Sequence, residues 1–219
     1  MSLSAWAWRG LAAAATTLLA AEGLYYLLRY VRWLREQQPK VLFFPAPVTC
    51  VRPLLLASPG RCDCSLPHRE SSLSSLARLL LAARRSLDVC VFSISSADLG
   101  GSVLAVHGRG VRVRVITDSD YMALAGSQVG TFRKAGIEVR HDQDTNYMHH
   151  KFALIDGSIL ITGSLNWSAQ AIFRNKENVI IIKNIDIVKA FTGEFERLWN
   201  EYDPTKYSFL HKGKRKPPI

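Results

Sequence analysis

The stretch from His149 to Asn166 carries residue types that suit chemistry on a phosphodiester. It has the form H-x-K-x4-D-x6-G-S-x-N, which occurs once in the 219 residues. Because residues 147–155 have a strand-like composition and successive strand side chains point to opposite faces of a sheet, we expect His149 and Lys151 on one face and His150 on the other. An imidazole and an ammonium group would then converge on one anion.

Each residue type in the motif suits a different part of that chemistry. A neutral imidazole nitrogen of His149 can attack phosphorus and form a covalent phosphohistidine, so no catalytic metal is expected. Lys151 would hold the non-bridging oxygens, while Ser164 and Asn166 would add uncharged hydrogen-bond donors. The leaving oxygen still needs a proton, and one histidine cannot act as attacking base and leaving-group acid at once. Since the motif occurs once, we expect a twofold homodimer in which His149 of each subunit reaches one shared site.

The motif resembles that of the phospholipase D superfamily, specifically its single-motif, dimer-forming branch. Further segments resemble the mitochondrial members of that superfamily, the Zucchini or cardiolipin hydrolase family, and they lie at 42–45, 110–118, 140–144 and 203–209. The resemblance covers residues 41–209 and implies that His149 is the nucleophile in one subunit and the general acid in the other. It also implies that Lys151 and Asn166 bind phosphate. Asp156 would support the site from behind, and Glu177 would orient the histidine through a carboxylate contact.

The same stretch also has a purely structural interpretation. Asp156 and Gly157 stand between two alternating apolar runs, at 152–155 and 159–162, which is a strong signal for a β-hairpin. The two interpretations are compatible, because the hairpin would be the scaffold on which the motif is displayed.

A second group of chemically active residues lies upstream, with the spacing Cys50-x11-Cys62-x-Cys64-x3-His68. Three thiolates and an imidazole are the ligand set of a tetrahedral structural zinc site. A disulfide in a secreted chain and free thiols in a Pro- and Gly-rich loop are the alternatives, and a reducing compartment disfavours the disulfide. The family resemblance implies a zinc-finger-like insertion at about 50–68. Cys90 lies in an apolar run, 87–94, and is expected to be a small core residue.

The amino-terminal segment, 1–40, has the composition of a membrane anchor with a basic juxtamembrane part. The Ala- and Leu-rich run from Leu11 to Leu28 has about the minimum length for crossing the apolar core of a bilayer. Aromatic residues flank this run and basic residues follow it, which favours a single span with the rest of the chain in the cytosol. A cleaved signal peptide is the alternative, and Glu22 would be costly inside a membrane. The family resemblance implies the mitochondrial outer membrane.

The remaining chain is long enough for one domain with a sizeable core. Apolar periodicity predicts helices at 71–85, 121–135 and 186–202, and it predicts strands at 87–94, 111–117 and 178–183. Strands interleaved with helices indicate α/β layers around a mixed sheet, and the family fold is an α/β/α sandwich. We therefore expect a catalytic domain at 41–209, followed by a disordered basic tail at 210–219.

The formal net charge of +10 favours an anionic partner without choosing one. Basic residues near the motif could attract RNA phosphates or a lipid headgroup, and they are Arg112, Arg114, Arg133, Lys134, Arg140, Arg174 and Lys176. Each one alone is better explained as part of a solvated surface.

Three functions are compatible with these features to different degrees. A single-strand endoribonuclease leads, with products that carry 5′-phosphates, and the resemblance links it to maturation of PIWI-interacting RNA and to the proteins of that pathway. A phospholipase D that cleaves cardiolipin to phosphatidic acid is the alternative, although no exposed apolar run stands near the motif. A non-enzymatic membrane scaffold is disfavoured by the intact histidine, lysine and asparagine.

Overall fold

The computed structural model describes residues 3–55, 62–143 and 146–206, with the backbone alone described for 3–15, 33 and 35–37. The chain divides into two compact units between residues 38 and 39. The basic tail predicted at 210–219 and part of the zinc insertion, at 56–61, lie outside the described residues.

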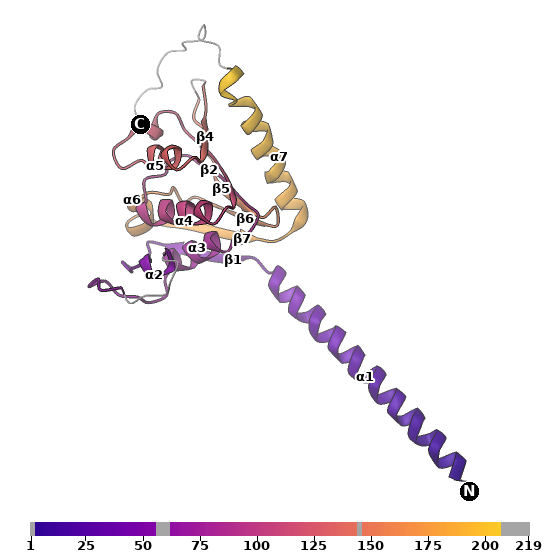
Figure 1. Cartoon of the computed structure of the whole chain (residues 1–219). Coiled ribbons are helices and arrows are strands. Elements are labelled where there is room, and N and C mark those ends of the chain that lie inside the picture. The colour runs from indigo at the N-terminus through magenta and orange to yellow at the C-terminus, as the bar shows by residue number, and fades with distance from the viewer. Residues whose placement is uncertain (1–2, 56–61, 144–145, 207–219) are drawn as a thin grey trace. The chain divides into compact units, whose positions relative to one another are not determined.

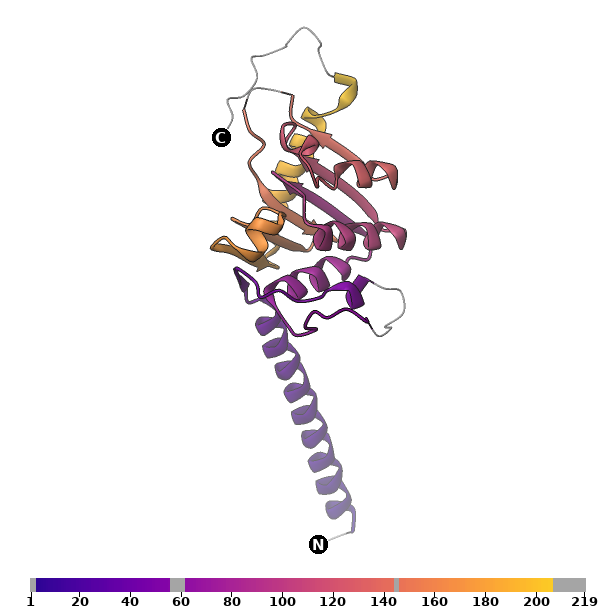
Figure 2. The same ribbon diagram turned by 90° about the vertical axis from the view of Figure 1, so that its left-hand side faces the viewer.

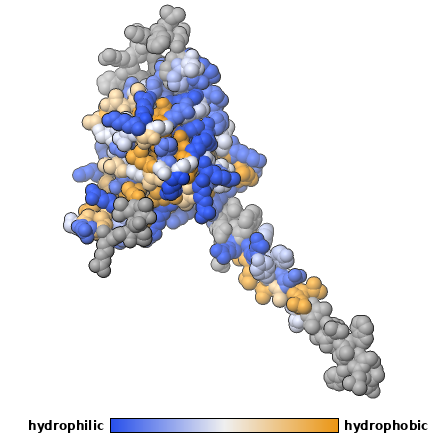
Figure 3. Space-filling model, viewed as in Figure 1, coloured by the Kyte–Doolittle hydropathy of each residue, from blue (hydrophilic) through white to orange (hydrophobic). Residues whose placement is uncertain are grey.

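The first unit is a single helix, α1 (Leu3–Gln37). No helix in the described part of the chain combines the length and the apolar character needed to cross a membrane. The helical part of the amino-terminal prediction is therefore confirmed, but the membrane span predicted at 11–28 is not supported. Hydrophilic residues stand among the apolar ones along α1 (Figure 3).

The second unit is built on one mixed sheet of seven strands in the order β1-β7-β6-β5-β2-β3-β4. The strands are β1 (Lys40–Phe44), β2 (Ser86–Val91), β3 (Arg112–Thr117), β4 (Glu138–His141), β5 (Lys151–Ile155), β6 (Ile159–Gly163) and β7 (Glu177–Ile182). Strands β2, β3 and β4 run parallel, and the remaining neighbours pair antiparallel. The predicted α/β class with a mixed sheet is confirmed.

Helices cover both faces of this sheet (Figures 1 and 2). The helices are α2 (Arg52–Leu55), α3 (Ser72–Leu81), α4 (Ala97–Gly108), α5 (Val129–Lys134), α6 (Ala169–Phe173) and α7 (Ile185–Glu201), with short 3-10 turns η1 (Tyr121–Ala123) and η2 (Pro204–Lys206). Buried residues of α3, α4, α5 and α6 share one apolar core, and those of α7 belong to a second. The unit is therefore an α/β/α sandwich with α7 alone on its face.

Strand alternation explains why two separate cores form. In β5, Ala153 and Ile155 belong to the core under α3–α6, whereas Phe152 and Leu154 belong to the core under α7. Because successive side chains of a strand point to opposite faces, a strand covered on both sides needs an unbroken apolar run. By the same parity, Lys151 projects towards the α3–α6 face.

One predicted helix is wrong in this unit. The stretch 121–135 was expected to be one helix, but it contains η1, an irregular segment and then α5. Leu124 is extended and Gly126 has a φ of 83°, so the helical hydrogen bonds cannot continue through this segment. Helix α4 was not predicted, because its glycine pair, Gly100 and Gly101, lowers helix propensity.

Candidate active site

The motif residues meet at one end of the sheet, where several strands begin or end. Lys151 opens β5 and pairs with Val91, the last residue of β2, so it lies beside Phe92. Strand β6 ends at Gly163 and leads directly into the Ser164–Asn166 segment, while β7 begins nearby at Glu177. The sheet order β7-β6-β5-β2 therefore brings together segments that are far apart in the sequence.

His149 and Lys151 are in direct contact. The Lys151 Nζ atom lies 3.1 Å from His149 Nδ1 and donates to the His149 carbonyl oxygen at 2.8 Å. An ammonium group only donates, so Nδ1 accepts this bond and a neutral ring carries its proton on Nε2. His150 turns to the opposite face, where its Nε2 lies 3.4 Å from Glu194 of α7. A phosphate oxygen that binds Lys151 would compete with the imidazole for the ammonium group.

The aromatic ring of Phe92 packs against both His149 and Lys151. Its centroid lies 4.5 Å from that of His149, and Lys151 Nζ lies 5.0 Å from the same ring. The ring packs against the imidazole, and the ammonium group of Lys151 lies over its π face, an arrangement that stabilises the charged form of the lysine. Phe92 itself is only 4% exposed, so its ring is part of the packed interior.

The surroundings lower the pKa of both side chains. Partial burial and then the charge of Lys151 lower the pKa of His149, while Asp118 works in the opposite direction. Burial also lowers the pKa of Lys151, although the carboxylate of Glu177 partly offsets this. A His149 pKa below its usual value leaves the ring neutral, and hence nucleophilic, at neutral pH.

Glu177 and Ser164 form a separate small network next to this pair. The Ser164 hydroxyl donates to one carboxylate oxygen of Glu177, and the Asn175 amide donates to the other at 3.1 Å. The Ser164 oxygen in turn accepts the backbone N–H of Asn178 at 3.1 Å. Within the described residues, Glu177 therefore acts on Lys151 through its charge and makes no hydrogen bond to His149, contrary to the expected histidine contact.

Asn166 lies in the segment that follows β6, with its side chain half buried. Its Oδ1 atom is buried and has no hydrogen-bond partner in the described part of the chain. The preceding segment is held by the Ser164 N–H, which donates to the Asn178 carbonyl at 3.1 Å. Gly163 permits this close approach, because a Cβ atom there would lie 2.2 Å from the same carbonyl oxygen.

The structure does not bring Asp156 to this site. It follows the last residue of β5, beside the first residues of β2, at the opposite end of the strand from Lys151. Its carboxylate accepts the backbone N–H groups of Arg84, Arg85 and Ser86 at 3.2, 2.7 and 2.9 Å. Asp156 thus ties the β5–β6 hairpin to the segment before β2 and does not contact the reacting groups.

Asp118 is a positioning residue that the sequence analysis missed. It follows β3, is fully buried, and accepts the backbone N–H of Met148 at 3.1 Å and of Asp120 at 2.9 Å. Because Met148 precedes His149, this carboxylate fixes the backbone that carries the imidazole. An acid directly after an apolar strand was the signal that could have identified it.

Most of the basic residues expected around the motif are engaged elsewhere. Arg114 lies on the α7 face, where it bonds Asp88 at 2.8 Å and Glu196 at 2.5 Å. Arg140 is likewise held by Glu138 and by the Trp199 carbonyl. By contrast, Arg174 and Lys176 are exposed in the short loop that leads to Glu177. The cations that remain for an anionic substrate near the site are therefore few.

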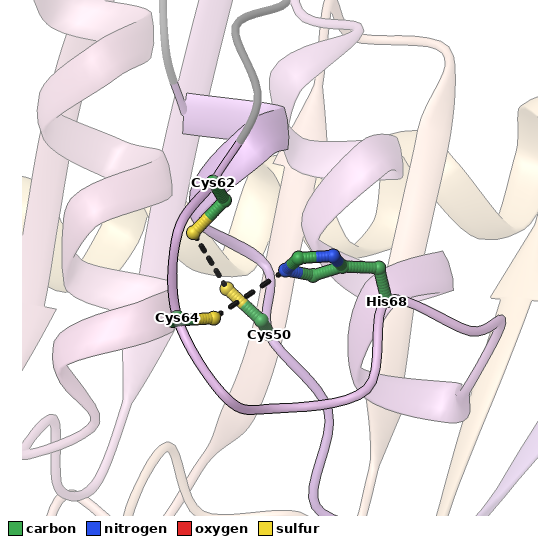
Figure 4. A group of neighbouring side chains, drawn as sticks. All are labelled: Cys50, Cys62, Cys64 and His68. Atoms are coloured by element: carbon green, nitrogen blue, oxygen red, sulfur yellow. Dashed lines mark hydrogen bonds between the residues drawn. The ribbon is translucent and has the colours of Figure 1, made fainter.

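The second predicted group, Cys50, Cys62, Cys64 and His68, does converge. Its ligand atoms lie within 4.8 Å of one another, with 3.7 Å between the Cys50 and Cys62 sulfurs and 3.4 Å between Cys64 Sγ and His68 Nε2 (Figure 4). Zn–S and Zn–N bonds of about 2.3 and 2.0 Å in a tetrahedron place such ligands about 3.5–3.8 Å apart. The three cysteines of the cluster are free thiols in this structure, so the disulfide alternative is not supported. The residues fit zinc.

The thiols of this cluster differ in acidity. Burial, followed by the neighbouring thiol of Cys64, raises the pKa of Cys50 to about 11. The Leu66 backbone, followed by Cys50, lowers the pKa of Cys64. A bound divalent cation would deprotonate the whole set, and binding would release protons.

The sequence is similar to a known protein family and to several named proteins. The model of a family described as cardiolipin synthase, PLD-like domain, matches residues 76–199. A Mus musculus protein named mitochondrial cardiolipin hydrolase is 58% identical, with 92% of this chain and 95% of the relative covered. The Homo sapiens protein of the same name is 53% identical, over 97% of this chain and 89% of the relative.

A solved structure shares the fold. Nuc, a phospholipase D family member from Salmonella typhimurium, superposes with a TM-score of 0.60 at 19% identity, covering 76% of this chain and 96% of Nuc.

Proposed function

The chain belongs to the phospholipase D superfamily, together with the proteins named mitochondrial cardiolipin hydrolase, and from this we propose that it is a phosphodiesterase acting through a phosphohistidine. The observation that carries the proposal is the contact between a neutral His149 and Lys151 at the open end of the sheet. The imidazole supplies the nucleophile, and the ammonium group supplies the charge that holds the phosphate oxygens.

The proposed reaction has two displacements at phosphorus. An imidazole nitrogen of His149 forms a bond to phosphorus while the bond from phosphorus to the leaving oxygen breaks, and a second imidazolium protonates that oxygen. Water then attacks phosphorus, gives a proton to the second imidazole, and releases His149 and a phosphate monoester. Lys151 and the amide of Asn166 would hold the non-bridging oxygens in both steps.

We further propose that the second imidazole is His149 of another copy of the chain. No second imidazole contacts His149 among the described residues, because His150 is bonded to Glu194 on the far side of the sheet. A twofold dimer is the simplest assembly that brings two identical histidines to one site.

Mixing subunits tests the shared site. After random exchange of equal amounts of wild-type and His149→Ala chains, about one quarter of the dimers are wild type, so we expect about one quarter of the activity of an all-wild-type sample. Activity of about one half, in proportion to the wild-type chains, would show that each chain carries a complete site.

For the substrate we propose single-stranded RNA cut to leave 5′-phosphates, in the maturation of PIWI-interacting RNA. The net charge of +10 and the exposed Arg174 and Lys176 beside the site support a polyanionic substrate. The relatives' name favours a second candidate, hydrolysis of cardiolipin to phosphatidic acid. The test is the full chain on single-stranded RNA and on cardiolipin vesicles side by side, with His149→Ala as control.

We also propose that the cysteine and histidine cluster holds a structural zinc ion, and that the protein works at mitochondria. The ligand spacing supports the first proposal, and the relatives' name supports the second. The outer membrane, with the catalytic domain facing the cytosol, is the specific location we propose. Protease treatment of intact mitochondria tests it, since a domain facing the cytosol is digested without rupture of the membrane.

A further inference from the structure

A pocket of about 440 Å³ opens next to the proposed catalytic pair. It lies between the segment that follows β2, the irregular segment after η1, and the start of α6. Phe92 and Asn166 line it and are also part of the catalytic site. A phosphodiester held by Lys151 would therefore place one of its two ester groups at the mouth of this pocket.

One wall of the pocket is aromatic. Tyr121 is half buried, and its ring centroid lies 4.1 Å from that of Phe92, whose ring in turn supports His149 at 4.5 Å. Leu124, 55% exposed, continues the wall towards the rim. A tyrosine ring beside an exposed leucine offers a flat apolar surface to a planar group.

The rest of the lining consists of small or apolar residues, Ile94, Ala125, Ala169 and Ala171, and of polar, uncharged ones. It includes the side chains of Asn166, Gln170, Asn175, Ser93, Ser95 and Ser168, and none of the described lining residues is charged. The Gln170 amide and the Tyr121 hydroxyl make no hydrogen bond in the described part of the chain, and Asn166 Oδ1 is buried without a donor. The pocket thus combines an aromatic face with unused donors and acceptors.

We propose that this pocket binds the nucleobase next to the scissile phosphate. The proposal rests on the RNA form of the proposed function. A nucleobase has a π face for Tyr121 and polar edges for the Gln170 amide and for Asn166 Oδ1, while the Asn166 NH2 group stays on the phosphate. An acyl chain would leave those polar groups desolvated without partners, and a second phosphate would find no cation among the lining residues. The central glycerol of cardiolipin has a hydroxyl but no face to stack.

The test uses the full chain and single-stranded RNA oligonucleotides in which one abasic nucleotide is moved step by step past a mapped cleavage position. An abasic nucleotide on one side of the scissile phosphate should lower kcat/KM about 5- to 100-fold, the effect expected for loss of one stacked base. Abasic nucleotides several positions away should have little effect.

Matched variants assign the effect to the pocket. Tyr121→Leu should cut normal RNA more slowly and should no longer distinguish the abasic substrate, whereas Tyr121→Phe should keep both the rate and the distinction. Gln170→Ala should weaken the distinction, and Gln38→Ala, exposed and outside the pocket, should not.

Three negative outcomes of these experiments can be told apart. If the wild-type chain cuts RNA equally well at abasic and normal positions, the pocket does not bind a base, although the nuclease function stands. If Tyr121→Leu slows hydrolysis of cardiolipin vesicles as much as RNA cleavage, Tyr121 merely supports Phe92 and the proposal is wrong. If the wild type hydrolyses cardiolipin but cuts no RNA, both the RNA function and the nucleobase pocket are overturned.

Discussion

Substituting Asp156 by Ala should cost stability and leave the chemistry of the folded enzyme intact. The carboxylate accepts hydrogen bonds from three backbone N–H groups, those of Arg84, Arg85 and Ser86. The backbone of Asp156 itself has a φ of 54°. Hydrogen bonds to charged groups contribute about 1.5–3 kcal/mol, but Arg84 and Arg85 are exposed and water would partly replace the carboxylate. Alanine at a positive φ adds about 1 kcal/mol. We expect a loss of about 2–3 kcal/mol, or about 4–12 °C in Tm.

The pH dependence of this loss has a defined sign. Burial works to raise the pKa of Asp156, but the N–H groups of Ser86, Arg85 and Arg84 outweigh it and hold the pKa below its usual value of 3.8. A carboxylate whose pKa is lower in the folded state stabilises the fold above its unfolded pKa and loses that effect as pH falls through the folded pKa. The difference in stability between wild type and Asp156→Ala should therefore be full at pH 7 and shrink below about pH 4.

Catalysis provides the decisive measurement. With about 3.3 Å per residue along β5, Asp156 lies roughly 16 Å from Lys151, which is beyond the Debye length of about 8 Å at physiological salt. Turnover of bis(p-nitrophenyl) phosphate per folded molecule, at a temperature well below Tm, should stay within about twofold of wild type. An Asp156→Asn variant that keeps its Tm but loses a hundredfold in kcat would refute a structural role for this residue.

Further predictions concern the site and the cysteine cluster. Gly163→Ala should lower the free energy of unfolding by about 1–3 kcal/mol, measured by chemical denaturation, and remove most of the activity, because the new Cβ would lie 2.2 Å from the Asn178 carbonyl oxygen. An unchanged free energy of unfolding would contradict this packing. A chelator should lower the Tm of the wild type and release zinc detectable by mass spectrometry, whereas Cys64→Ser should show neither response. Activity should fall at low pH where His149 becomes protonated, and the Lys151 charge, together with burial, lowers the pKa of that step. Lys151→Met should therefore raise this pKa and move the acid limb of the kcat/KM profile to higher pH. An acid limb at the same pH as in the wild type would exclude this coupling.

The parts of the fold that the sequence predicted are those with strong local patterns. Strand β3 and helix α7 follow from alternating and helical apolar periodicity, and the β5–β6 hairpin follows from its two apolar runs around Asp156 and Gly157. Helix α4 could not be predicted, because its glycines serve packing: a Cβ at Gly100 would meet the Gln128 side chain at 2.7 Å, and one at Gly101 would meet Leu55 at 3.0 Å. Contacts of this kind depend on tertiary structure and leave no local pattern.

The same distinction holds for the site. His149 and Lys151 are two residues apart, so strand alternation alone predicts that they share a face. Phe92 and Asp118 reach the site only because β2 lies between β5 and β3 in the sheet. The structural role of Asp156 depends on hydrogen bonds to residues about seventy positions earlier, which no motif encodes.

The local environment of His149 also bears on how two identical histidines could perform opposite tasks. Burial and Lys151 both lower its pKa, so each chain by itself favours the neutral imidazole that attacks phosphorus. The general acid needs the protonated form, and in a symmetric dimer both histidines have the same surroundings until substrate binds. A phosphodiester that draws Lys151 of one chain onto its oxygens would remove that hydrogen bond from the attacking imidazole. The developing negative charge on the leaving oxygen would in turn favour the proton on the other histidine. In this scheme the asymmetry comes from the substrate, so one motif per chain is sufficient for both roles.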